Sequence, residues 1–109
     1  MTTPVDRPLP LGEIAQLVRS KNAGPFWLTL DIFFATDADY ERATAPGALT
    51  ENRIAALYRV DPADVAIHRL PEIRVIKASF PRRVVQGSFT DRDMHSGQQH
   101  VPLAALPIP

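Results

Sequence analysis

The sequence predicts an α+β fold: a two-layer sandwich with a mostly antiparallel sheet and helices on one of its faces. Its length of 109 residues fits a single domain. Hydrophobic residues repeat with the period of a helix in some stretches and with the period of a strand in others. These stretches follow one another as helix, strand, two helices and two or three strands. That order favours an α+β sandwich over regular β–α alternation.

The N-terminal region divides into a tail and a first helix. Residues 1–10 contain three prolines and are expected to form a flexible tail, because proline fixes φ and lacks a backbone N–H. The single domain is then expected over residues 11–109. Four apolar residues from Leu11 to Val18 are spaced i, i+3, i+4 and i+7, which predicts a helix. This helix is expected to end within residues 21–24, where positive φ values suit asparagine and glycine.

Residues 26–34 predict a central strand, because their even-numbered positions are all apolar. The other face of this strand is mixed and carries Asp31. Asp31 has two interpretations. It forms an ion pair with Arg74 or Lys77 on an adjacent strand, or it acts as a general base beside aromatic side chains.

The acidic middle of the chain is predicted to be helical. Residues 36–43 form a short helix capped by Thr36 or Asp37, and Thr50 caps a second helix. Asp61, followed by proline, gives the same signal for a single turn.

The last part of the chain predicts further strands. Residues 65–70 and 73–80 form two strands around a proline turn, and residues 101–108 pack as an apolar edge segment broken by prolines. An open sheet of the ferredoxin-like kind, with helices on one face, fits this content and length.

Composition excludes several classes of protein. The formal net charge is zero, so a dedicated nucleic-acid-binding protein is not expected. No apolar run reaches the roughly 20 residues of a membrane span, and the first ten residues lack the apolar core of a signal peptide. We therefore expect a cytoplasmic protein. The sequence contains no cysteine, which excludes disulfides, thiolate metal sites and thiol catalysis.

The zero net charge conceals two oppositely charged segments. Residues 31–64 hold seven acidic and three basic side chains, whereas residues 65–83 hold one acidic and five basic ones. The basic segment has no nucleic-acid motif, so it favours an anionic small molecule or a charged contact with the acidic segment.

The link between the first helix and the first strand is a candidate anion site. Its residues are two cations, a hydroxyl, an amide and a glycine that allows close backbone approach: Arg19, Ser20, Lys21, Asn22 and Gly24. The alternative is an ordinary helix C-terminus, where basic residues, asparagine and glycine are common.

A polar stretch near the C-terminus is the second candidate. His95 and His100 are candidate groups for proton transfer, and Gln98 and Gln99 are candidate hydrogen-bond donors to a polar ligand. A metal site is not favoured, because histidines five residues apart diverge on a helix and point to opposite faces of a strand. The alternative is a solvated loop. No phosphate-binding, dinucleotide-binding, serine-hydrolase or zinc-protease motif occurs, and no cofactor is identified.

The chain also resembles a known family. The segments that carry the resemblance are Arg19–Phe34, Asp39–Glu41, Leu49–Thr50 and Gly97–Leu103. They look like a small bacterial domain-of-unknown-function family, encoded beside or fused to larger proteins of the acyclic-terpene-utilisation (AtuA) type. The helix–RSxxxG–strand opening is also similar to the ferredoxin-like C-terminal domain of AtuA-type proteins, where an acidic residue and an extra glycine stand in place of Lys21–Ala23.

The resemblance implies a partner more firmly than a reaction. We expect a small subunit or accessory domain of a heteromeric AtuA-type enzyme acting on a carboxylic acid or acyl-CoA. In it, Arg19 and Lys21 would hold an anionic group, and His95 or His100 would transfer protons. The alternative is a homo-oligomeric module that binds a small anion or regulates another protein. A stand-alone enzyme is least favoured, because no complete set of nucleophile, base and orienting group is present.

Overall fold

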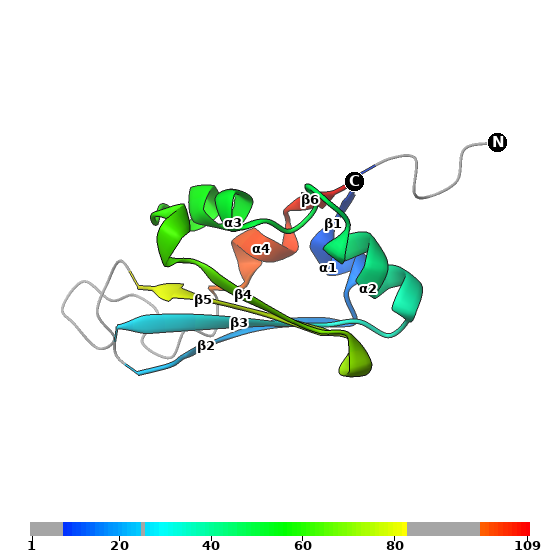
Figure 1. Cartoon of the computed structure of the whole chain (residues 1–109), viewed down its shortest axis with the longest axis horizontal. Helices are drawn as coiled ribbons and strands as arrows, with labels where there is room; N and C mark the ends of the chain where they lie inside the picture. The colour runs from blue at the N-terminus through cyan, green and yellow to red at the C-terminus, as the bar shows by residue number, and fades with distance from the viewer. Residues whose placement is uncertain (1–7, 25, 83–98) are drawn as a thin grey trace.

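The computed structural model describes residues 8–24, 26–82 and 99–109. Four strands form one antiparallel sheet in the order β2-β3-β5-β4: β2 (Leu17–Asn22), β3 (Trp27–Phe33), β4 (Ala66–Leu70) and β5 (Val75–Pro81). The helices are α1 (Leu11–Ile14), α2 (Asp37–Thr44), α3 (Glu51–Tyr58) and α4 (Val101–Ala104). All four lie on one side of the sheet, so the predicted α+β architecture of two layers is confirmed (Figure 1).

The strand order contains a split β–α–β unit. β3 leads through α2 and α3 to β4, and β5 inserts between β3 and β4, antiparallel to both. The strand on the other side of β3 is β2, which precedes β3 in the chain and pairs with it as a hairpin. A ferredoxin-like chain, with its β–α–β–β–α–β order, instead supplies its last strand after a second helix.

The structure corrects the prediction for the first helix. The helix predicted from Leu11 into residues 21–24 ends at Ile14 as α1, and residues 17–22 form strand β2. The backbone of β2 pairs with β3 along its whole length, from Leu17 opposite Phe33 to Asn22 opposite Leu28. The helical spacing of the four apolar residues covers only two turns, which is a weak signal. The pairing of β2 with β3 outweighs this local preference for a helix.

The other elements follow their local signals. α2 begins after Thr36, whose hydroxyl accepts a hydrogen bond from the Asp39 N–H, and α3 begins after Thr50 in the same way. The single turn after Asp61 is a 3-10 helix, η2 (Pro62–Asp64). A second one, η3 (Pro71–Ile73), joins β4 to β5.

The two ends of the described chain meet within the helical layer. Strand β1 (Leu9–Pro10) pairs with β6 (Pro107–Ile108), so the predicted C-terminal edge segment consists of α4 followed by β6. α1 packs directly on α4 at Gly12, where an added Cβ would meet the Ala104 carbonyl oxygen at 3.2 Å. Of the predicted tail, residues 1–7 lie outside the described chain.

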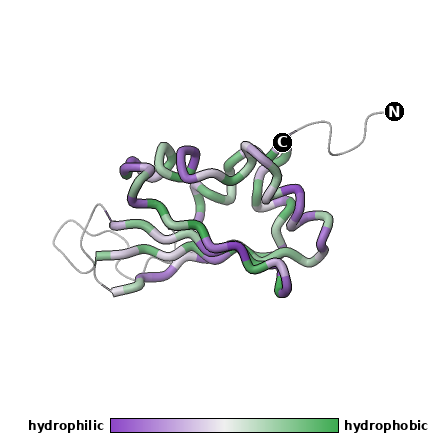
Figure 2. Tube along the Cα trace, in the orientation of Figure 1, coloured by the Kyte–Doolittle hydropathy of each residue, from purple (hydrophilic) through white to green (hydrophobic). Residues whose placement is uncertain are grey.

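The two faces of the sheet differ in character. The face under the helices supplies the core, with Leu30, Ile32 and Ile76 fully buried. We call the opposite face the open face, because no described helix covers it (Figure 1). The register places these side chains on it: Leu17, Arg19, Lys21, Trp27, Thr29, Asp31, Phe33, His68, Leu70, Val75, Lys77 and Ser79. Hydrophilic positions accordingly interrupt the hydrophobic strands in the middle of the sheet (Figure 2).

Within the described ranges, every helix is too short or too polar to cross a membrane.

Candidate functional site

Strand β2 divides the predicted anion site between two faces. Because side chains alternate along a strand, Arg19 and Lys21 lie on the open face, whereas Ser20 and Asn22 point toward the helical layer. Gly24 lies in the turn between β2 and β3 with a φ of +83°. The five residues therefore do not surround a single ligand position.

The open face gathers three cations around one carboxylate. Asp31 in β3 is 0% exposed, and its Oδ2 lies 3.3 Å from Arg19 Nε and 3.8 Å from Lys21 Nζ. Its Oδ1 lies 3.4 Å from Lys77 Nζ of β5. We call these four residues the Asp31 cluster. Sheet register creates it, because Arg19, Asp31 and Lys77 are directly opposite one another on three adjacent strands.

The cluster explains how a carboxylate is buried on this face. An isolated ionised carboxylate is costly to bury, and the cations compensate that cost with ion pairs and one hydrogen bond from Arg19. The predicted partner Lys77 is confirmed. The other predicted partner, Arg74, instead lies 3.5 Å from Asp37 at the start of α2. Three cations and one carboxylate leave the cluster with a net charge of +2.

The surroundings of the cluster are partly apolar and partly hydroxylic. The Arg19 guanidinium lies over the Phe33 ring, 5.0 Å from its centroid. On the other side, the hydroxyl oxygens of Thr29 and Ser79 are 3.4 Å apart. Large side chains are exposed at both ends of the face, with Leu17 at 49% and Trp27 at 43%.

The helical side of β2 meets the C-terminal segment. The backbone N–H of His100 donates a hydrogen bond to the Ser20 hydroxyl over 3.0 Å. Next to it, the Tyr58 hydroxyl donates to the Gln99 carbonyl oxygen over 2.6 Å. His100 Nδ1 is buried and, in the part of the chain that is described, has no hydrogen-bond partner. Burial raises the pKa of Tyr58 well above its ordinary value, so this phenol is neutral at physiological pH.

The two sequence candidates therefore meet only in part. Ser20 and His100 are in contact, whereas Arg19 and Lys21 lie on the opposite face of the sheet. His95 and Gln98 lie outside the described residues. Sequence reasoning includes Arg82 in the basic segment but does not pair it with Asn22, to whose side chain the Arg82 guanidinium donates a hydrogen bond over 2.9 Å. No local pattern could reveal this pair, because 60 residues separate the two positions.

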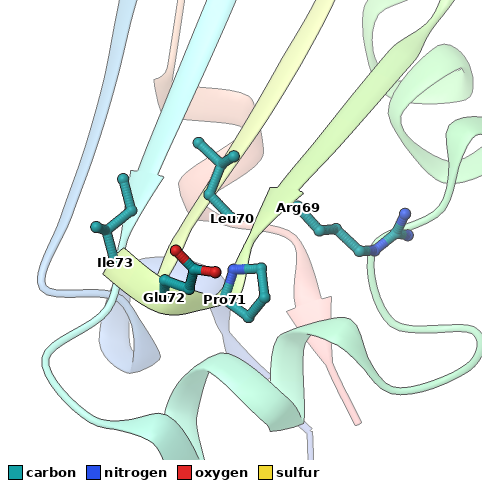
Figure 3. Close-up of a pocket in the computed structure, with 5 residues that line it drawn as sticks. All are labelled: Arg69, Leu70, Pro71, Glu72 and Ile73. Carbon is teal, nitrogen blue, oxygen red and sulfur yellow. The ribbon is translucent and has the colours of Figure 1, made fainter.

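A pocket is lined by a third group of residues. It has a volume of about 310 Å³ and lies at the turn from β4 through η3 toward β5 (Figure 3). It is lined by Arg69, Leu70, Pro71, Glu72 and Ile73. No predicted site residue lines it, so it does not join the two candidates. Among the described side chains, no group of three or more His, Cys, Asp or Glu is placed to hold a metal ion.

Comparison with known proteins gives a family. A family model described as "Domain of unknown function (DUF4387)" matches residues 11–107. No curated protein matches the chain significantly, and neither does any solved structure.

Proposed function

The chain belongs to the DUF4387 family, and from that premise we propose that it is an accessory subunit of a heteromeric enzyme. The larger chain would be an AtuA-type protein, and the substrate a carboxylic acid or an acyl-CoA. The proposal also places the protein in the cytoplasm. In this assembly the open face docks on the larger chain, and the Asp31 cluster contributes positive charge to a shared site.

The observation that supports this proposal is the composition of the open face. It combines exposed apolar side chains at both ends, Leu17 and Trp27, with a cationic centre. Interfaces that form after folding commonly join an apolar contact area with charged groups that select the partner. The sheet register places both exposed side chains on the same face as the cluster, so one partner docked on that face would cover all of them.

The charge of the cluster favours a partner of different sequence. A two-fold dimer centred on the open face would bring the same patch of each subunit together, because such interfaces are isologous. Two clusters of net charge +2 would then face each other and repel. A partner with acidic side chains would instead be attracted.

Co-expression with an AtuA-type chain tests the proposal. We expect the two chains to co-purify as a stable complex, with activity on an acid or acyl-CoA that neither chain has alone. The double variant Leu17→Ser/Trp27→Ser should lose the complex. Val101→Ser is the matched control, because Val101 is 51% exposed but lies on α4, away from the open face. Wild-type chains that fail to co-purify would refute the proposal.

The alternative is a homo-oligomeric module that binds a small anion, which the net positive charge of the Asp31 cluster also favours. Light scattering separates the two: a dimer of the isolated chain, stabilised thermally by an anion without any partner, supports the alternative.

A further inference from the structure

We propose that Arg19, Lys21 and Lys77 together form a binding site for one oxyanion group, a carboxylate or a phosphate, on the open face. Asp31 is a positioning residue, which holds the three cations in place beneath the anion. The inference deepens the proposed function by naming the chemistry that the subunit would bind. It needs no partner chain, however, and is tested on the isolated protein.

The use of lysine in this chain first indicates the site. The sequence contains two lysines, Lys21 and Lys77, against ten arginines, and both lysines lie in the Asp31 cluster. They come from strands that are not adjacent, β2 and β5, with β3 between them. The sheet therefore holds two ammonium groups and one guanidinium around the same carboxylate on a rigid support.

The burial pattern shows that the cations remain accessible. The Asp31 carboxylate is fully buried, but the side chains of Arg19, Lys21 and Lys77 are 53%, 55% and 41% exposed. The carboxylate thus lies below and the cations lie between it and solvent. An anion that approaches the open face meets the cations before it meets the carboxylate.

The hydrogen-bonding capacity of the cluster is not used up. Arg19 donates to Asp31 through Nε, which leaves its two terminal nitrogens with no hydrogen bond to a described residue. Each lysine ammonium has three donors, and one ion pair to Asp31 occupies only part of that capacity. A terminal guanidinium and two ammonium groups are the donors that carboxylates and phosphates prefer.

The charge balance of the cluster also favours a second anion. Like charges held close together repel, and one carboxylate neutralises only one of the three cations. Asp31 Oδ1 is buried and has no hydrogen bond within the described chain, so the cluster is not arranged for the best possible internal pairing. An oxyanion above the cations would neutralise the remaining charge.

The two lysines provide a direct measurement. We would label lysine with ¹³C at Cε, which gives two signals, both from the proposed site. Sodium phosphate and sodium acetate are titrated separately into the full chain at constant ionic strength, with sodium chloride as the reference. We expect both lysine signals to shift along one saturation curve. A response to phosphate alone assigns a phosphate group as the ligand, and a response to acetate assigns a carboxylate.

Matched variants separate a built site from general attraction. Lys77→Gln should weaken binding, followed at the Lys21 signal, by about tenfold, because a charged hydrogen-bond donor is lost. Lys21→Gln should do the same at the Lys77 signal, and its exposed side chain makes misfolding a poor explanation. Arg59→Gln removes one positive charge at the end of α3 and should leave binding unchanged.

Two results would overturn the inference. One is a lysine response to phosphate and acetate no larger than the response to chloride. The other is an equal loss of binding in Arg59→Gln and Lys77→Gln. Because the isolated chain is used, neither result depends on whether a larger chain co-purifies.

Discussion

Asp31 shows how a single residue organises one face of the sheet. A carboxylate in the middle of a central strand is costly to bury, and it remains there because three cations converge on it. The sequence predicted part of this arrangement, since Lys77 lies on a strand that the hydrophobic pattern identifies. It did not predict the contribution of Arg19, because the same residue was assigned to a helix.

Asp31→Asn should lower the free energy of unfolding by about 1–3 kcal/mol. The variant removes the group that pairs three cations, although these are half-exposed and regain water, which limits the loss. Urea denaturation at low and high salt measures the effect. We expect high salt to restore part of the loss, because it screens the repulsion that the cations then feel. Unchanged stability at low salt would show that the carboxylate does not stabilise the fold.

Tyr58 should make the fold sensitive to alkaline pH. Its ring packs on Phe80 with centroids 4.8 Å apart, and burial raises its pKa above the ordinary value near 10. A raised pKa means that the unfolded chain loses this proton first as pH rises. The contribution of Tyr58 to the free energy of unfolding is therefore fully present below about pH 10 and is lost as the pH rises above it.

Denaturation curves between pH 8 and 11 test this behaviour. At neutral pH, the free energy of unfolding of Tyr58→Phe should be about 1 kcal/mol lower, because the hydrogen bond to Gln99 is lost. At alkaline pH, the free energy of unfolding should fall less in this variant than in the wild-type protein. If the free energy of unfolding fell equally at alkaline pH in the wild-type protein and in Tyr58→Phe, a group other than Tyr58 would be the cause.

At the scale of elements, local signals succeeded where they agreed with the packing. Helix α3 was predictable because the capping threonine, Thr50, precedes a buried stripe that includes Ile54. β3 was predictable because its period-two pattern extends over the whole strand. β2 was not, because it carries polar side chains toward both faces and so lacks a period-two hydrophobic pattern. Its pairing with β3, rather than its own sequence, determines its conformation.

The cap of α3 gives a prediction at this scale. Thr50→Ala should lower the free energy of unfolding by about 1 kcal/mol, because the Arg53 N–H loses its acceptor. Thermal denaturation measures the change. Thr50→Asp should preserve most of the stability, since an aspartate accepts the same hydrogen bond. A Thr50→Asp variant as unstable as Thr50→Ala would show that capping is not the cause.

At the scale of the whole molecule, the charged segments of the sequence do not coincide with the layers of the fold. The acidic segment of the sequence, residues 31–64, contains α2 and α3 of the helical layer, and the basic segment contains β4 and β5 of the sheet. Asp31 of the acidic segment, however, lies in β3 on the open face, and Arg69 of the basic segment donates to a carbonyl oxygen of the helical layer. Of the three cations of the Asp31 cluster, only Lys77 belongs to the basic segment, while Arg19 and Lys21 come from β2. Sheet register, rather than the charge of a sequence segment, therefore makes the centre of the open face positive in a molecule of zero net charge, which is consistent with an anionic ligand bound on that face.

The C-terminal residues close the helical layer and contribute to the core. Ile108 of β6 is 0% exposed and belongs to the core. Arginines of both long helices hold the backbone of this segment: Arg53 donates to the Pro107 carbonyl oxygen over 2.8 Å, and Arg42 donates to that of Pro109 over 3.0 Å. β6 therefore links α2 and α3 to β1 at the other end of the chain.

Ile108→Ala should lower the free energy of unfolding by about 2–4 kcal/mol, because it leaves a cavity in a core that both chain ends enclose. Val101→Ala, at an exposed position of the same segment, should cost less than about 1 kcal/mol. Urea denaturation followed by the fluorescence of the single tryptophan, Trp27, reports whether the sheet unfolds together with the helical layer. We expect a single transition at a lower urea concentration for Ile108→Ala. If Trp27 kept the wild-type transition while the helical signal shifted, the two layers would unfold independently, and the C-terminal segment would stabilise only its own layer.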